Sequence, residues 1–230
     1  MKISIIRYFL IFTAIIIGTL SLKYAAANLS YFKVDGYLTH WEETKLPTQE
    51  ELDLAFEASD SMLKLHGHHP HYLDMAAKVY EWQSFKDQSD SVKSLKSLEK
   101  ALVLYKKSSQ LREHWPLTWA YMANVKSNMG ILDDEFYTYI NKAMLYGPYM
   151  PEVNLQISKI FLSHWGKLPG LPTKVGLEQV KRASYFHSTR YNLLFYARSI
   201  AKEHIVCTVG RLNNLKVIID HWVCRENKPK

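Results

Sequence analysis

Four histidines crowd into six consecutive positions of the chain: His66, His68, His69 and His71. Neutral imidazole is a common ligand of zinc and copper. A metal site also needs a fixed geometry, and here the nearest acid in sequence is Asp74, with no cysteine close by. We therefore interpret the stretch as a solvated loop between two helices, packed on Tyr72. The four histidines are weak metal candidates, and no cofactor is expected.

Three consecutive acids, Asp133, Asp134 and Glu135, could serve glycan chemistry, which uses paired carboxylates. The run lies at the predicted start of a helix, where the helix dipole favours acids, and that explanation is sufficient. The sequence contains no Gly-rich phosphate loop, zinc-protease helix motif or Gly-x-Ser-x-Gly elbow. We assign no catalytic residue. An enzyme that acts on a lipid-linked glycan through Asp134 or Glu135 is the alternative.

The two cysteines, Cys207 and Cys224, lie 17 residues apart across a predicted helix break at Gly210 and positions 213–214. In an oxidising compartment they could form a disulfide that joins the last two helices. A loop of that size contributes about 3 kcal/mol in the chain-entropy model. Two buried thiols are the other interpretation. A catalytic thiol is disfavoured because no spacing singles out a base for it.

The N-terminus predicts a membrane helix, because residues 8–22 carry no charge. Lys2 and Arg7 precede this run, so the positive-inside rule keeps the N-terminus in the cytoplasm and exports the rest of the chain. Lys23 follows the run as it would in a retained anchor, whereas the small residues at 25–27 offer a cleavage site. Anchor and cleaved signal both stay open for residues 1–27.

The net charge of +7 is concentrated in the C-terminal segment, since residues 180–230 hold ten basic and three acidic residues. Such a segment attracts nucleic acid, anionic lipid or an anionic polymer, or is simply a solvated helix surface. Export argues against nucleic acid. The aromatic residues of this segment have helical spacing and are expected in the core: Tyr185, Phe186, Tyr191 and Phe195.

Apolar residues recur every three or four positions from residue 48 to 225, which predicts an all-α fold. Thr48 with Glu51 three residues later is a capping box that starts a helix. Before it, Gly36 and Pro47 indicate that residues 28–47 are an extended lead.

Internal similarity predicts repeats. Pro70, Pro116 and Pro151 each open a helical segment, and the second and third are 35 residues apart. The first interval is 46 residues, and the surplus is expected as a loop insertion at 83–90. The pattern resembles the tetratricopeptide repeat, with Trp119 at its large position and Lys126 where it has Tyr. This predicts an α-solenoid of three to four hairpins over 48–187, capped by a helical hairpin at 188–230.

A repeat stack has a concave face, which could grip a peptide terminus or an extended segment. Polar residues of the first helices are expected to line this partner-binding groove: Asp74, Lys78, Asn124, Ser127, Asn128 and Lys159. An ordinary polar surface is the alternative.

Three segments, at 69–82, 111–120 and 146–153, together with Trp165, resemble signatures of the VpsP-like polysaccharide-biosynthesis proteins. Glu113 departs from the proline of that pattern. The resemblance implies a single-pass protein of the bacterial inner membrane with a periplasmic helical-repeat domain. Its implied role is that of a non-catalytic scaffold or adaptor in exopolysaccharide or O-antigen-type synthesis and export. The implied partners are proteins of that membrane machinery, or an anionic polysaccharide bound directly by the basic end.

Overall fold

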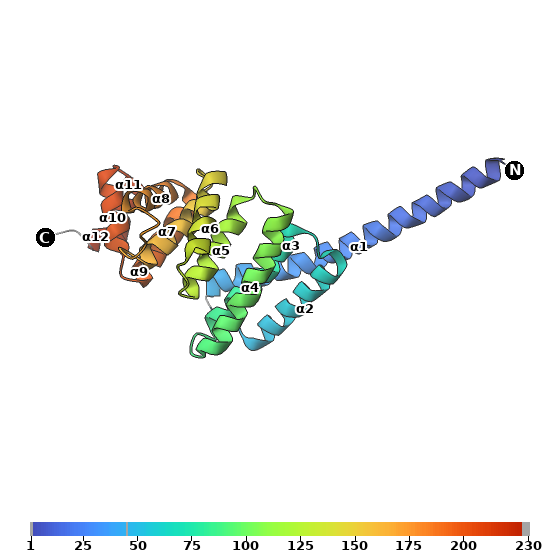
Figure 1. The fold of residues 1–230 in the computed structure, drawn as a ribbon, viewed down its shortest axis with the longest axis horizontal. Coiled ribbons are helices and arrows are strands. Elements are labelled where there is room, and N and C mark those ends of the chain that lie inside the picture. Colours follow the sequence, from blue (N-terminus) through green and yellow to red (C-terminus); the bar gives the residue numbers. More distant parts are fainter. Residues whose placement is uncertain (1, 45, 227–230) are drawn as a thin grey trace. The chain divides into compact units, whose positions relative to one another are not determined.

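The computed structural model describes residues 2–44 and 46–226, and these residues contain helices and no strand (Figure 1). The prediction of an all-α fold is therefore confirmed. The chain divides into two compact units, Met1–Arg112 and Glu113–Lys230, which are described separately. The boundary falls just before the second helix-opening proline, Pro116.

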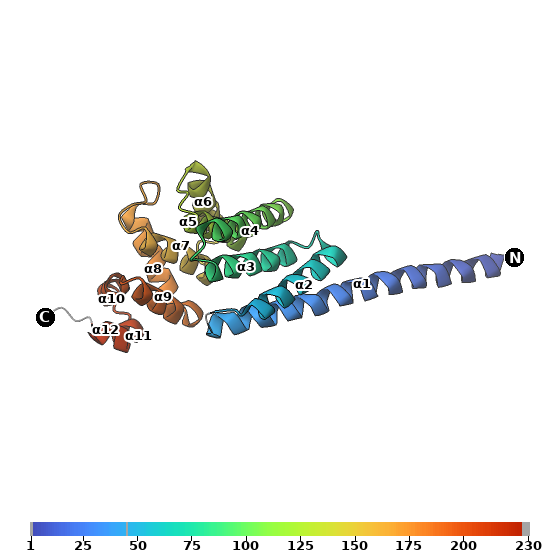
Figure 2. The same cartoon turned by 90° about the horizontal axis from the view of Figure 1, so that it is seen from below.

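Unit 1 begins with a long helix, α1 (Lys2–Thr44), whose first half extends away from the other helices of the unit (Figures 1 and 2). This helix is long and apolar enough to cross a membrane. Its second half buries Ala27, Val34, Leu38 and Trp41, a stripe at helical spacing. The predicted extended lead at 28–47 is thus wrong as far as residue 44. Burial of this stripe outweighs the cost of about 1 kcal/mol for an interior glycine at Gly36.

Three further helices complete unit 1: α2 (Gln49–His66), α3 (Pro70–Lys86) and α4 (Ser91–Leu111). The start of α2 has the predicted capping box, in which the Thr48 side chain accepts from the Glu51 N–H and Glu51 bonds back to Thr48. Pro70 occupies the first turn of α3, and Asp90 caps α4. Helix α2 lies along the second half of α1 (Figure 2), and α3 packs on α1, α2 and α4.

Unit 2 starts with two helical pairs, α5 (Pro116–Asn128) with α6 (Asp134–Tyr146) and α7 (Pro151–Ser163) with α8 (Thr173–Tyr185). Helix α5 also packs on α7, and α7 packs on α9 (His187–Ser199), so each first helix contacts the next one. The prolines at 116 and 151 open their helices as predicted. Gly176 allows α8 to approach α7, because a Cβ there would lie 2.2 Å from the Phe161 ring.

The helix lengths show where the surplus of the first repeat interval lies. Helices α3 and α4 have 17 and 21 residues, whereas α5 and α6 have 13 each. The 11-residue surplus of the first interval therefore lies in the two longer helices, and only residues 87–90 form the connection between them. The predicted loop insertion at 83–90 is wrong, because its first four residues continue α3 and bury Ser84. The architecture is helical-repeat-like.

The C-terminal part of unit 2 contains α9, α10 (Glu203–Leu212), α11 (Lys216–Ile219) and α12 (Trp222–Glu226) rather than the single hairpin predicted for 188–230. Cys207 of α10 and Cys224 of α12 form a disulfide with a Cα–Cα distance of 5.4 Å, and both are buried. Gly210 does not break α10; the break comes at residues 213–214, after which α11 folds back with Ile218 against Gly210.

Most of the aromatic residues expected in the C-terminal core are on the surface. Tyr185, Phe186 and Phe195 are exposed, and Tyr191 is half-buried against His187 and His221. The chain changes direction between α8 and α9 at Phe186, so the apolar spacing does not continue in phase across that point. The buried face of α9 instead carries Thr189, Leu193, Leu194 and Ala197.

Candidate protein-binding groove

The six residues predicted to line a concave groove are divided between the units, with Asp74 and Lys78 in unit 1 and the other four in unit 2. Asp74 is buried, and its Oδ2 accepts from Nη2 of Arg112 at 3.1 Å. The Asp74 side chain is directed toward α4, and its bond to Arg112 links the start of α3 to the end of α4. The prediction that Asp74 faces an open groove is wrong.

In unit 2, Ser127 is buried as well, and its hydroxyl hydrogen-bonds Nε2 of His164 at 2.9 Å. This bond joins the ends of α5 and α7, so the prediction of Ser127 as a groove residue is also wrong.

The ammonium of Lys159 lies over the ring of Tyr196, 5.4 Å from its centroid. Asn124 is half-buried and Asn128 is exposed near the end of α5.

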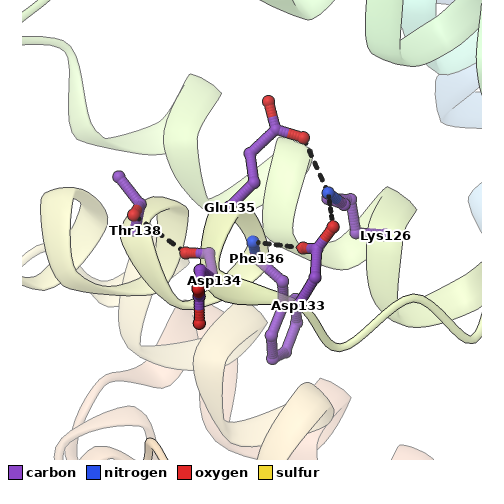
Figure 3. Close-up of polar contacts among 6 residues, drawn as sticks. All are labelled: Lys126, Asp133, Asp134, Glu135, Phe136 and Thr138. Atoms are coloured by element: carbon purple, nitrogen blue, oxygen red, sulfur yellow. Dashed lines mark hydrogen bonds and ion pairs between the residues drawn. The ribbon is translucent and has the colours of Figure 1, made fainter.

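Two acids at the start of α6, Asp133 and Glu135, pair with a buried lysine (Figure 3). Lys126 is only 4 % exposed, and its Nζ donates to Oδ2 of Asp133 at 2.7 Å and to Oε2 of Glu135 at 2.6 Å. Asp133 also caps α6 by accepting the Phe136 N–H at 2.9 Å. Asp134 is exposed, and its backbone carbonyl accepts from Thr138. The predicted candidates Asp134 and Glu135 therefore differ in their surroundings, since the Glu135 carboxylate pairs with Lys126 and Asp134 is exposed.

The electrostatics of this cluster follow from its geometry. Burial opposes the charge on Lys126, but hydrogen bonds to the two carboxylates outweigh it and raise the Lys126 pKa. The hydrogen bond from Lys126, with that from the Phe136 N–H, lowers the pKa of Asp133. Burial, followed by the hydrogen bond to Glu135, raises the pKa of Tyr139. These pKa shifts favour the charged forms of Lys126 and Asp133, and the hydrogen bonds of the cluster fasten α5 to α6.

The predicted histidine stretch closes α2 and leads into α3. The rings of His66 and His69 are 5.1 Å apart, and His69 packs on Tyr72 at 4.2 Å between centroids. Burial lowers the pKa values of His69 and His71. Within residues 2–44 and 46–226, no group of three or more His, Cys, Asp or Glu side chains is arranged to hold a metal ion. The packing of Tyr72 beneath the loop agrees with the prediction.

An open groove lies elsewhere in unit 1, along α3 between α2 and α4. One part has a volume of about 520 Å³, and an adjoining part about 400 Å³. The two parts share residues from all three helices: Phe56, Asp60, Tyr80, Lys96 and Lys100. They therefore form one trough, which we call the α2–α4 groove. Along α4 it extends from Lys93 to Leu104, about 16 Å at 1.5 Å per residue.

The floor and one end of the α2–α4 groove are apolar. Ala76 lies in the floor, and Leu63, Val103 and Leu104 line one end. The rings of Phe56 and Tyr80 pack against each other with centroids 4.8 Å apart. Burial raises the pKa of Tyr80, so its hydroxyl stays protonated.

The two walls differ in charge. The α4 wall presents Lys93, Lys96 and Lys100, and the ammonium of Lys100 lies 5.2 Å from the Tyr80 ring centroid. Glu99 is the one carboxylate that α4 contributes to the described lining, while α2 contributes Asp60. The α4 side of the groove is thus mainly basic, and the other two carboxylates of the described lining are Asp60 of α2 and Asp87 directly after α3.

Ser59 of α2 adds a polar group to the groove lining. Its side chain is 3 % exposed, and within the described residues its hydroxyl has no hydrogen-bond partner. A buried hydroxyl without a partner costs about 1–3 kcal/mol.

Sequence reasoning missed this groove because it placed the concave face on other residues. One signal was present, since positions 93, 96 and 100 carry lysine at helical spacing and share one face of α4. The facing residues Phe56 and Tyr80 are 24 positions apart, and only the packing of α2 on α3 brings them together.

Several arginines of the basic C-terminal segment already have partners within unit 2. Arg182 pairs with Glu178 and donates to the Pro148 carbonyl, and Arg190 donates to the carbonyls of Tyr185 and Phe186. Arg198 stacks on the Trp222 ring at 4.2 Å.

No model of a protein family matches the chain, and no curated protein matches it in sequence.

Proposed function

We propose that this protein is a membrane-anchored, non-catalytic adaptor whose α2–α4 groove receives an amphipathic helix of a partner protein. One observation carries the proposal. The groove joins an apolar floor, a buried hydroxyl without a partner and a mainly basic α4 wall, with Asp60 on the α2 side, in a single open trough.

The dimensions of the groove fit a helix. About 16 Å corresponds to three helical turns, so residues at i, i+3 or i+4, and i+7 of the partner would reach the floor. Carboxylates along one flank of that helix would meet Lys96 and Lys100, and a basic residue on the other flank would meet Asp60. This arrangement sets the orientation of the partner as well as its affinity.

The placement at a membrane is supported by α1 and by the disulfide. Helix α1 continues without a break from its apolar half into the packed half, where Ala27 is fully buried. Cleavage at 25–27 would cut this helix at the edge of the core, which favours a retained anchor. A disulfide between buried cysteines suits an oxidising compartment, in agreement with an exported domain.

The polysaccharide pathway rests on the three sequence segments that resemble VpsP-like proteins. We propose that the partner belongs to membrane machinery for exopolysaccharide polymerisation, ligation or export. The tetratricopeptide-like solenoid is part of the same proposal, and the contacts between successive first helices in unit 2 support it.

Photocrosslinking in intact membranes tests the groove. A benzoylphenylalanine at Lys96 lies inside it, whereas one at Lys107, exposed and outside the groove lining, serves as the matched control. We expect position 96, and not 107, to capture one membrane protein of the polysaccharide machinery. Lys100→Glu should abolish this adduct without changing the helical circular dichroism.

Equal capture at both positions would contradict the groove. An adduct at 96 that contains glycan instead of protein would support the anionic-polymer alternative, whose binding should weaken steeply with salt. Turnover of a lipid-linked glycan that is lost on Glu135→Gln would establish the enzyme alternative.

A further inference from the structure

The uncovered part of α1 has the length of a bilayer. Residues 6–26 are exposed apart from the half-buried Thr13, and Ala27 is the first fully buried side chain. Twenty-one helical residues extend about 31 Å, against about 30 Å for a hydrocarbon core. Arg7 and Lys23 flank the uncharged run and could extend their charged ends toward the two interfaces.

The α2–α3 connection lies against α1 directly after this stretch. The ring of His66 is 4.6 Å from that of Tyr24, one residue beyond Lys23. The Tyr72 hydroxyl donates to Oδ1 of Asn28 at 2.8 Å. His71 lies 5.3 Å from the Tyr31 ring, and Tyr72 stacks on the same ring. These contacts hold the connection at the level of residues 24–31.

If α1 spans the membrane, residues 24–31 and the α2–α3 connection that contacts them lie at the headgroup layer. Residue 24 lies about 3 Å before Ala26, the last residue of the uncovered 31 Å stretch, and residue 31 lies about 8 Å beyond Ala26 along the helix. The headgroup layer occupies about 5–8 Å on each side of the hydrocarbon. Since α1 is one continuous helix through this region, the connection cannot move away from the membrane without breaking its contacts with α1.

The side chains at this level suit an interface. Tyrosine and histidine rings are amphipathic, and aromatic residues of this kind are enriched where membrane meets water. Leu29 and Phe32 of α1 are exposed beside them, as are Lys23 and Lys64. His71 faces Asp35, Lys78, Arg112 and His69, and burial keeps it and His69 neutral at neutral pH.

We propose that residues 66–71, together with Tyr24 and Tyr31, form a seat that rests in the phospholipid headgroup layer of the exported leaflet and holds unit 1 upright on the membrane. The inference rests on the anchoring by α1 put forward above. It has a consequence for the groove, because Leu63 lies one helical turn before His66. The apolar end of the α2–α4 groove then lies near the membrane, and its Lys93 end points away.

Two labelled variants of the full-length protein test the seat. His68→Cys places a fluorophore in the connection, and Gln88→Cys places it in the exposed α3–α4 connection, about 26 Å away along the 17 residues of α3. Both native cysteines are in the disulfide, so without reductant only the new thiol is labelled. The protein is reconstituted in vesicles of phosphatidylethanolamine and phosphatidylglycerol that contain a headgroup-nitroxide lipid.

We expect severalfold stronger quenching at position 68 than at position 88, with both variants floating with the vesicles. Flotation without preferential quenching at 68 would overturn the seat and leave the anchor intact. A chain that fails to float would overturn the anchor and the seat together. The first result would leave the proposed function intact, whereas the second would remove its membrane anchor, so the two failures can be distinguished.

Discussion

Asp133 has two roles at the start of α6, and alanine at this position removes both. Loss of the cap on the Phe136 N–H costs about 1 kcal/mol. A hydrogen bond to a charged group contributes about 1.5–3 kcal/mol. The lower value applies to the bond from Lys126, because the Asp133 side chain is half exposed and Glu135 still pairs with Lys126. Asp133→Ala is expected to destabilise the α5–α6 pair by about 2.5 kcal/mol.

Hydrogen exchange of peptides from α5 and α6, measured on the full-length protein in detergent, reports this loss locally. A change of 2.5 kcal/mol corresponds to about seventyfold faster exchange of the most protected amides. The neighbouring Asp134 is the matched control, since its exposed carboxylate contributes through the helix dipole, about 0.3–1 kcal/mol. Asp134→Ala should accelerate exchange about fivefold at most.

The same cluster predicts a pH dependence. The hydrogen bonds from Lys126 and the Phe136 N–H lower the folded-state pKa of Asp133 below the unfolded value of about 3.9. Its stabilisation is therefore complete at neutral pH and is lost as the pH falls through the lowered folded pKa.

Similar exchange rates for the alanine variants at 133 and 134, at neutral pH, would refute the assignment of Lys126 and Asp133 as a structural pair.

Three further changes test other parts of the structure. Replacing Cys207 and Cys224 by serine should lower the free energy of unfolding by about 3 kcal/mol, measured by urea denaturation, and reductant should then have no added effect. Gly176→Ala should lower the free energy of unfolding by about 1–3 kcal/mol, because the added methyl group meets an aromatic ring of α7. Gly36→Ala adds a methyl group in open space and should stabilise α1 by up to about 1 kcal/mol. Thermal melts that rank the two variants the other way would contradict the packing. Ser59→Ala should leave stability unchanged or slightly raised, since no hydrogen bond to a described residue is lost; a clear destabilisation in the same melts would show that the hydroxyl has a partner.

Local signals in the sequence were sufficient for the helical class and for several helix starts. Thr48 with Glu51, and the prolines at 70, 116 and 151, act within one helical turn, so their effect does not depend on distant residues. The same holds for the apolar run of α1, whose length and lack of charge define a candidate membrane helix.

Sequence reasoning was wrong where tertiary packing opposed a local preference. Gly36 and Pro47 suggested an extended lead, yet α2 offers an apolar surface that keeps residues 28–44 helical. In the resemblance to the tetratricopeptide repeat, Lys126 stands where that pattern has tyrosine, and the sequence marked it as a departure. Its burial becomes possible because Asp133 and Glu135 fold back toward it from the next helix.

The sequence by itself determined the helical class and the starts of α2, α3, α5 and α7, because capping, proline placement and apolar spacing are short-range effects. Tertiary structure alone decided which polar residues are available for binding. It buried Asp74 and Ser127 in contacts between helices, and it assembled the α2–α4 groove from three helices. Exposure depends on what packs against each residue, and the partners of a helix face come from distant positions in the chain.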